Sequence, residues 1–357
     1  MKTGIWLPVR MGSWRYAPAI DGLPANGMEP AGNWKLIPLL LKGISMDAVL
    51  QGLSGIFEVV LMAGLGFFLS RTGWLWETAG KDLTRLTMTV ALPPFMIYSL
   101  KSNFTRQGLI ETAPDLLLPF ASIFVAYIAG RLWAAILHVS FEHRGIFTCT
   151  CCIANAIFIG LPVNVALFGE KSVPSAMLYY IANTAMFWGL GAYLIVKDAG
   201  SGRKFTIAEM AKKLRTPPLM GFLAGVVLVL LDIPLPASVL TACRYVGNMA
   251  TPMALMVVGI QMSQIPFSSI HWDRDLAGAM AGRFILSPLC LFLLLSFIPV
   301  SPMSGRVFLL QAGMPAMTNM TILAASVGAD VRYATTINCL SLLLGIFFIP
   351  LYMFLLS

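Results

Sequence analysis

The stretch that decides the fold is Cys152-Ile-Ala-Asn155-Ala-Ile-Phe-Ile-Gly160-Leu-Pro162-Val-Asn164, which lies inside an apolar segment long enough to span a membrane. Its glycine and proline lower helix propensity and remove a backbone donor in mid-segment. A second apolar segment, Gln311-Ala-Gly313-Met-Pro315-Ala-Met-Thr318-Asn319, contains the same ingredients. Freed backbone groups are tolerated in a bilayer only where protein or a water-lined cavity satisfies them. Two ordinary proline kinks are the alternative reading, but the matching positions favour two broken helices that form a site.

A repeated phrase supports two related halves. Ala129-Gly130-Arg131 precedes the first broken segment and Ala281-Gly282-Arg283 precedes the second, each within an apolar stretch. Paired intramembrane arginines and interrupted helices are the layout of a secondary transporter, whose substrate sits near the bilayer midplane where the broken helices meet.

Composition indicates an all-α integral membrane protein, because 58% of the residues are hydrophobic and only 11% are charged, against about 25% charged in soluble domains. A span needs about 20 apolar residues. The candidate spans are 48–70, 83–100, 116–139, 146–168, 175–196, 217–235, 237–262, 276–300, 306–328 and 333–356. They predict ten transmembrane helices in two five-helix repeats, 46–196 and 217–357, joined by a loop at 197–216. An odd number of spans per repeat inverts the second one.

Lysine and arginine positions set the orientation through the positive-inside rule. One side would hold Arg71, Lys81, Arg85, Arg144, Lys197, Arg203, Lys204, Lys212, Lys213, Arg215, Arg274 and Arg332, and the other Lys101, Arg106, Lys171, Arg244 and Arg306. We therefore predict a multi-pass protein of the cell's inner (plasma) membrane, with the 197–216 loop cytoplasmic and both termini outside. The net charge of +8 then reflects topology and contact with anionic lipid, and no nucleic-acid partner is expected, since the charges are scattered over loops.

Residues 1–45 do not fit this scheme. They lack helical periodicity and the apolar region of a signal peptide, and they place basic residues on the predicted outer side. We interpret them as an atypical extension that is either a mis-assigned start, with Met46 opening the first span, or a disordered or interfacial tail.

Four motifs resemble the auxin efflux carrier family. They are Asn155-x4-Gly160-Leu161-Pro162, Arg283-Phe-x3-Pro288, Leu310-Gln311-Ala312-x2-Pro315, and the ending from Ala334 through Ile349-Pro350-Leu351-Tyr352. The resemblance covers essentially 46–357 and implies two inverted repeats, broken fourth and ninth helices that cross at mid-membrane, and a transport domain (spans 3–5 and 8–10) moving against a scaffold (spans 1, 2, 6 and 7). It further implies elevator-like export or exchange of organic anions, dimerisation through the scaffold, and Asn155 as the side chain that holds a substrate carboxylate.

The candidate substrate-binding residues are Asn155, Gly160, Pro162, Asn164, Gln311, Pro315, Thr318 and Asn319. The sequence is closer to the bacterial malonate and malate carriers than to the plant exporters, since its central loop is short and Ala316-Met317-Thr318-Asn319 replaces the plant Gln-Gly. A small mono- or dicarboxylate is therefore the expected substrate, rather than auxin.

Few charged residues fall within the spans, and three of them are candidate charge or coupling sites. Arg131 and Arg283 are costly in lipid and should face protein or a cavity; they either attract an anion or neutralise backbone carbonyls, or else they position helices near the interface. Glu58 is either a proton or counter-charge site or a polar helix contact. The broken segments contain no acid, which disfavours a sodium site built on paired carboxylates.

Other classes of function have little support. The spacing in Cys149-Thr-Cys151-Cys152 is not that of a zinc site, and no phosphate-binding loop or metalloprotease motif occurs, so we predict no metal and no cofactor. No nucleophile with a base, or acid pair, lies on facing spans, which argues against an enzyme. An anion channel, which would also use broken helices and a basic lining, is the main alternative.

Overall fold

The computed structural model describes residues 5–9, 13–17, 46–76, 78–200, 215–264 and 273–356. The chain divides into two compact units, 1–32 and 33–357. In the first unit, β1 (Ile5–Val9) pairs antiparallel with β2 (Ser13–Ala17). The prediction of an all-α chain is wrong for this hairpin, whose aromatic and β-branched residues favour strands. The rest of the 1–45 extension lies outside the described residues.

The second unit is helical, and every candidate span contains helix. The first five candidate spans correspond to α2 (Met46–Arg71); α3 (Ala79–Leu86), η2 (Thr87–Ala91) and α4 (Leu92–Asn103); α5 (Arg106–Thr112), η3 (Ala113–Leu116) and α6 (Leu117–Ile136); α7 (Phe141–Cys152), η4 (Ala156–Gly160) and α8 (Leu161–Phe168); and η5 (Glu170–Ser172), α9 (Val173–Met186), η6 (Phe187–Gly191) and α10 (Ala192–Asp198). The first helix begins at Met46, where the sequence placed its start.

The remaining spans follow the central loop. They correspond to α12 (Pro217–Leu230); α13 (Ala237–Gly247) and α14 (Ala250–Ser263); α15 (Arg274–Ala281), η8 (Gly282–Leu286) and α16 (Ser287–Leu294); α17 (Pro302–Ala312) and α18 (Asn319–Val327); and α19 (Val331–Leu356). Three continuous helices, Arg106–Ile136, Arg274–Leu294 and Val331–Leu356, are long and apolar enough to cross a membrane.

Several spans are interrupted by single π-helical turns, and prolines account for three of them. The turns η2, η4 and η8 each lead into a helix with proline in its first two positions, namely Pro93 in α4, Pro162 in α8 and Pro288 in α16. A proline lacks the N–H that would continue the i→i−4 ladder, and one π turn lets the helix resume beyond the gap.

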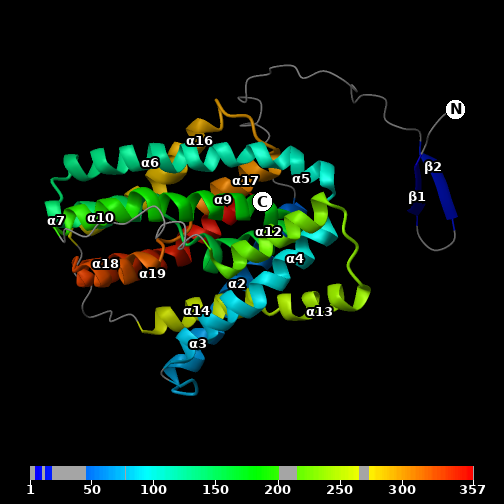
Figure 1. Cartoon of the computed structure of the whole chain (residues 1–357), viewed down its shortest axis with the longest axis horizontal. Coiled ribbons are helices and arrows are strands. Elements are labelled where there is room, and N and C mark those ends of the chain that lie inside the picture. Colours follow the sequence, from blue (N-terminus) through cyan, green and yellow to red (C-terminus); the bar gives the residue numbers. More distant parts are fainter. Residues whose placement is uncertain are drawn as a thin grey trace. The chain divides into compact units, whose positions relative to one another are not determined.

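The helices pack in two groups (Figure 1). The first group comprises α2, α3, α4, α12, α13 and α14, in which α14 lies beside α2 and α3 while α4 lies against α12 and α13. The second group comprises α6 to α10 and α15 to α19, where α6 contacts α7, α9 and α16, and α9 contacts α17. The groups meet where α2 contacts α8 and α19, and where α14 contacts η4.

Glycines set two of the close approaches within the first group. A Cβ on Gly259 would lie 1.9 Å from the Ala63 carbonyl oxygen, so only glycine lets α14 approach α2 this closely. A Cβ on Gly221 would lie 2.5 Å from Pro93 Cα, so glycine at this position lets α12 pack closely against α4. Small residues have this role in membrane bundles, where close backbone contact replaces the hydrophobic effect.

The turn between α18 and α19 is fixed by Asp330. Its Oδ1 accepts a 2.9 Å hydrogen bond from the Tyr333 N–H, and its Oδ2 lies 3.0 Å from His143 Nε2. The imidazole also stacks on the Tyr333 ring at a centroid distance of 3.9 Å. Burial opposes ionisation of Asp330, but the hydrogen bonds from Tyr333 and His143 outweigh it and lower the pKa of this carboxyl.

Candidate functional site

Two helices of the second group stop inside the bundle and resume after an irregular stretch. Helix α7 ends at Cys152 and helical structure resumes at Ala156, while α17 ends at Ala312 and α18 begins at Asn319. The breaks therefore fall where the sequence placed them. Each leaves one C-terminal half-helix end and one N-terminal half-helix end within the bundle.

The two broken segments pair with each other. The Asn155 N–H donates to the Pro315 carbonyl at 2.8 Å, and the Met317 N–H donates to the Ile153 carbonyl at 3.3 Å. Between them, Ala154 and Ala316 form an antiparallel bridge. This crossing satisfies backbone groups that would otherwise be unpaired in the membrane interior, which is the condition for breaking a helix there.

A side chain from the helix after each break holds the crossing in place. Asn183 of α9 acts like a neighbouring strand, since its Oδ1 accepts from the Ala154 N–H at 3.0 Å and its Nδ2 donates to the Ala154 carbonyl at 2.9 Å. On the other segment, the Ala316 N–H donates to Ser341 Oγ of α19 at 3.1 Å. The crossing is thus supported in a similar way from both sides.

Arg283 lies at the C-terminal ends of both half-helices and is completely buried. Its guanidinium donates to the Thr150 carbonyl in the last turn of α7 at 3.4 Å, and to the carbonyl of Ala312, the last residue of α17. A third bond, 3.0 Å long, reaches Ser287 Oγ. A cation at a helix C-terminus offsets the partial negative charge of the free carbonyls, so this arginine stabilises both breaks.

The other two charged residues from the spans lie elsewhere. Arg131 forms a bidentate ion pair with Asp198, with N–O distances of 2.7 and 3.3 Å. The Asp198 side chain is fully buried. This pair joins α6 to the end of α10. Glu58 is exposed on α2 and, like the two arginines, is not among the residues that line the polar cavity described next.

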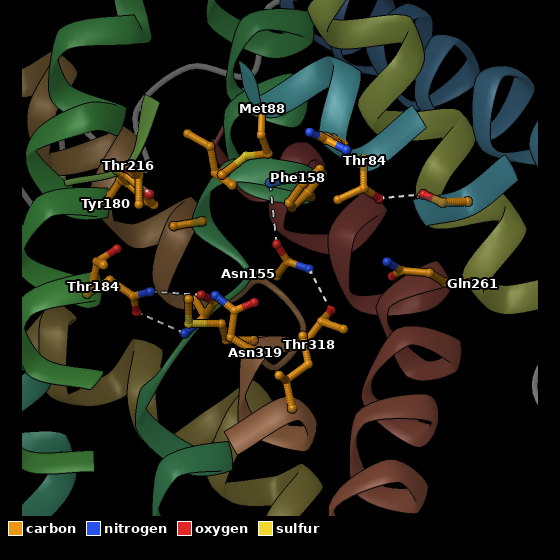
Figure 2. A pocket seen from close by; sticks show the side chains of 18 of the residues that line it. Thr84, Met88, Asn155, Phe158, Tyr180, Thr184, Thr216, Gln261, Thr318 and Asn319 are labelled. Atoms are coloured by element: carbon orange, nitrogen blue, oxygen red, sulfur yellow. Dashed lines mark hydrogen bonds between the residues drawn. The ribbon is translucent and has the colours of Figure 1, made fainter. Parts of the chain in front are cut away.

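A polar cavity of about 680 Å³ lies beside the crossing, between the two groups of helices. Its lining side chains include Thr84, Tyr180, Asn183, Thr184, Thr216, Gln261, Gln264 and Asn319, together with the cations Lys81 and Arg85 of α3. Among the residues the structure describes, its lining contains no aspartate or glutamate. Figure 2 shows Asn155 near the centre of this cavity, with Thr318 and Asn319 below it and Thr184 and Gln261 on opposite walls.

Asn155 is the N-cap of the second half-helix in its span. Its Oδ1 accepts from the Phe158 N–H at 3.3 Å, and its Nδ2 lies 3.5 Å from Thr318 Oγ1, which is the long end of a hydrogen bond. Both resumed helices, Ala156–Phe168 and Asn319–Val327, start at the cavity wall. The first turn of a helix has N–H groups without an intrahelical partner and a partial positive charge, so this wall suits an anion.

The structure separates the predicted residues into two sets. Asn155, Thr318 and Asn319 line the polar cavity. Gly160, Pro162, Asn164 and Gln311 are buried behind it. There Asn164 Nδ2 donates to the Gly160 carbonyl at 2.7 Å and Gln311 Nε2 to the Ala156 carbonyl at 3.2 Å. Pro315 contributes its carbonyl to the crossing.

Several cavity residues were absent from the sequence-based set. Lys81 and Arg85 counted only as charges that orient the protein, although their i, i+4 spacing places both on one helix face. Asn183 is a lone amide in an apolar span, which was the available signal for its role. Thr84 and Gln261 carry no local signal, because only the packing of α3 against α14 brings them to the same cavity.

Comparison with known proteins agrees with this architecture. The family described as "Membrane transport protein" matches residues 52–353. An "Uncharacterized transporter" of Methanocaldococcus jannaschii is 24% identical over 296 residues, which cover 81% of this chain and 91% of the relative. Another, from Methanothermobacter thermautotrophicus, is 25% identical over 305 residues, covering 83% and 96%.

A third relative carries a more specific description. This "Putative malonate transporter" of Rhizobium meliloti is 22% identical over 197 residues, or 54% of this chain and 61% of the relative. Helices apolar enough to span a membrane and a family match over most of the chain establish a multi-pass membrane protein with a transport role rather than a catalytic one. The chain belongs to the membrane transport protein family, in agreement with its resemblance to the auxin efflux carriers.

Proposed function

We propose that the protein is a secondary transporter that exports or exchanges small organic anions, with carboxylates as its substrates. The observation that carries this proposal is the cavity, which combines two half-helix N-termini, the Asn155 amide and two cations without an acid among its described lining residues. A carboxylate would accept from Asn155 Nδ2 and lie in the partial positive charge of the two helix N-termini. Charge-assisted bonds of this kind are shorter and stronger than neutral ones.

Lys81 and Arg85 extend the positive potential toward one end of the cavity. Both are exposed, and they share the cavity lining with Thr216 and Gln264, residues that adjoin the start of α12 and the end of α14. In the sequence, the 197–216 loop leads directly into α12. The distribution of basic residues favours a cytoplasmic position for this loop, which places both termini outside. In that orientation the cavity would open on the cytoplasmic side of the plasma membrane.

The two groups of helices support an elevator-type mechanism. In this reading the inverted five-helix repeats supply a scaffold (α2, α3, α4, α12, α13 and α14) and a mobile transport domain that carries the crossing. The cavity is lined from both groups, so sliding one group past the other would change its access from one membrane face to the other. The related supports of the crossing by Asn183 and Ser341 fit the predicted inverted repeat. We further propose that the scaffold helices form a homodimer, as the family resemblance implies.

Malonate is the first substrate to test, because the rhizobial relative is named for it. In proteoliposomes, a carrier gives saturable uptake that is stimulated by substrate on the opposite side, whereas a channel gives flux far above carrier turnover and no exchange. A panel of mono- and dicarboxylates identifies the substrate class. Absence of saturable carboxylate exchange from correctly reconstituted protein would overturn the proposal.

The cations provide a second test. Replacing both Lys81 and Arg85 with glutamine should weaken carboxylate binding and reduce its dependence on ionic strength, since exposed charges act through a screened field. Arg106→Gln, an exposed change at the start of α5 away from the cavity, is the matched control. Equal affinities for all variants would show that the two cations do not attract the substrate.

A further inference from the structure

A second cavity, about 290 Å³ in volume, lies against Pro315 of the crossing. Side chains from α2 and α14 form one wall, and Ile159, Pro315 and α19 form the other. Among the residues that the structure describes, its lining side chains are all apolar and none of them also lines the polar cavity. Water has no polar side chain to bind there, so such a space stays dry.

Three lining residues of the apolar cavity are also exposed on the surface of the helix bundle. Val60 and Phe67 of α2 and Ile346 of α19 line the cavity while remaining 51%, 36% and 45% exposed. The exposed neighbours Leu61 and Phe347 continue the same apolar surface. In a bilayer this surface is covered by acyl chains, and an open apolar void beside them forfeits dispersion contacts that a chain would make.

We propose that this cavity is a lipid site, occupied by one acyl chain of a membrane phospholipid that enters between α2 and α19. The chain would reach lining residues that annular lipid cannot touch, such as Leu342 (4% exposed) and Leu255 (2% exposed). It contacts both groups of helices and lies against Pro315, whose carbonyl binds the Asn155 N–H. A lipid tail therefore supports the crossing from a cavity separate from the polar one.

Gly64 allows the site to be closed selectively. It lines the cavity, and a Cβ built on it meets no heavy atom within 4 Å. A helical leucine side chain points back toward the preceding turn, so we expect leucine at this position to extend over Val60, an exposed residue of the lining. Gly189, on η6, also has open space around its Cβ and lines neither cavity, which makes Gly189→Leu the matched control.

The experiment uses the full chain in phosphatidylcholine vesicles doped with phosphatidylcholine that carries a photoreactive diazirine in mid-chain. After irradiation, peptide mass spectrometry should find adducts on the buried Leu342 and Leu255 as well as on the exposed Phe347. Gly64→Leu should lose the buried adducts and keep those on Phe347, whereas Gly64→Ala and Gly189→Leu should keep both. Adducts confined to exposed residues in the wild-type protein would overturn the proposal without any variant. Undiminished buried adducts in a folded Gly64→Leu protein would overturn it as well. Neither outcome depends on whether the protein transports carboxylates.

Discussion

Replacing Asn155 with aspartate separates the two roles that the structure gives this side chain. Its Oδ1 caps the resumed helix at the Phe158 N–H, and its Nδ2 borders the polar cavity beside Thr318. Aspartate caps helices as well as asparagine does, so the variant should keep the break and the apo melting temperature. It loses the donor and places a negative charge where the anion would bind.

The expected loss of affinity is large. A hydrogen bond to a charged group contributes about 1.5–3 kcal/mol, which corresponds to roughly 10- to 150-fold in affinity. Two unit charges about 4 Å apart repel by about 4 kcal/mol at an effective dielectric constant of about 20, or roughly another thousandfold. Malonate binding by Asn155→Asp should therefore be undetectable. The affinity of Asn155→Ala for malonate should lie between those of Asn155→Asp and the wild-type protein.

The assay is a thermal shift in detergent at pH 8, with and without malonate, followed by uptake into proteoliposomes. Asn164→Asp provides the opposite pattern, because Asn164 is buried behind the cavity and donates to the Gly160 carbonyl. That change should lower the apo melting temperature by placing an unpaired acid in the interior. An Asn155→Asp protein that keeps the wild-type malonate shift would refute the assignment of Asn155 to the anion.

Three further predictions concern stability and are read as melting temperatures in detergent. Arg131→Gln leaves the fully buried Asp198 without its cation and should lower the free energy of unfolding by roughly 3 kcal/mol. This is the low end of the range for a broken buried ion pair, because the Arg131 side chain is 32% exposed. Replacing both residues by leucine should recover most of the lost stability. Gly160→Ala places a Cβ 1.9 Å from Gln311 Oε1 and should lower the free energy of unfolding by roughly 1–3 kcal/mol. Adding Gln311→Ala should remove this clash and restore the lost stability. An unchanged melting temperature for the single variant would contradict this packing. The lowered pKa of Asp330 means that its stabilisation is present above about pH 4 and is lost as the pH falls through the folded-state pKa. Asp330→Asn should therefore reduce the loss of stability at acid pH, by less than about 1 kcal/mol because the side chain is partly exposed. The same loss of stability at acid pH in the variant and the wild-type protein would contradict this prediction.

Local sequence predicted the breaks well. Gly160, Pro162 and Pro315 act on their own backbone, because they lower helix propensity or lack a backbone hydrogen-bond donor. Their effect can therefore be predicted without knowledge of the neighbouring helices. The identity of each partner could not be predicted in the same way. Arg283 was expected to face protein or a cavity, but only the structure brings its guanidinium to the carbonyls of Thr150 and Ala312.

The same distinction applies to Arg131 and the cations of the cavity. The repeated Ala-Gly-Arg phrase suggested equivalent roles for Arg131 and Arg283, yet Arg131 pairs with Asp198, which the sequence analysis did not consider. Lys81 and Arg85 were taken only as markers of orientation. Their place in the cavity depends on how the two groups of helices meet, and no pattern along a single helix reports that.

The amino-acid sequence is enough to identify this chain as a helical membrane protein of a transporter family and to locate both helix breaks. Hydropathy, proline and glycine decide these features through the nearest backbone and through the bilayer, which acts on every segment alike. Only the tertiary structure decided which breaks pair, which side chains cap them and which residues share a cavity. Those contacts join positions far apart in the chain, such as Asn155 with Pro315 and Asn183 with Ala154, and they form because a polar group inside a membrane protein must find its partner in the packed bundle.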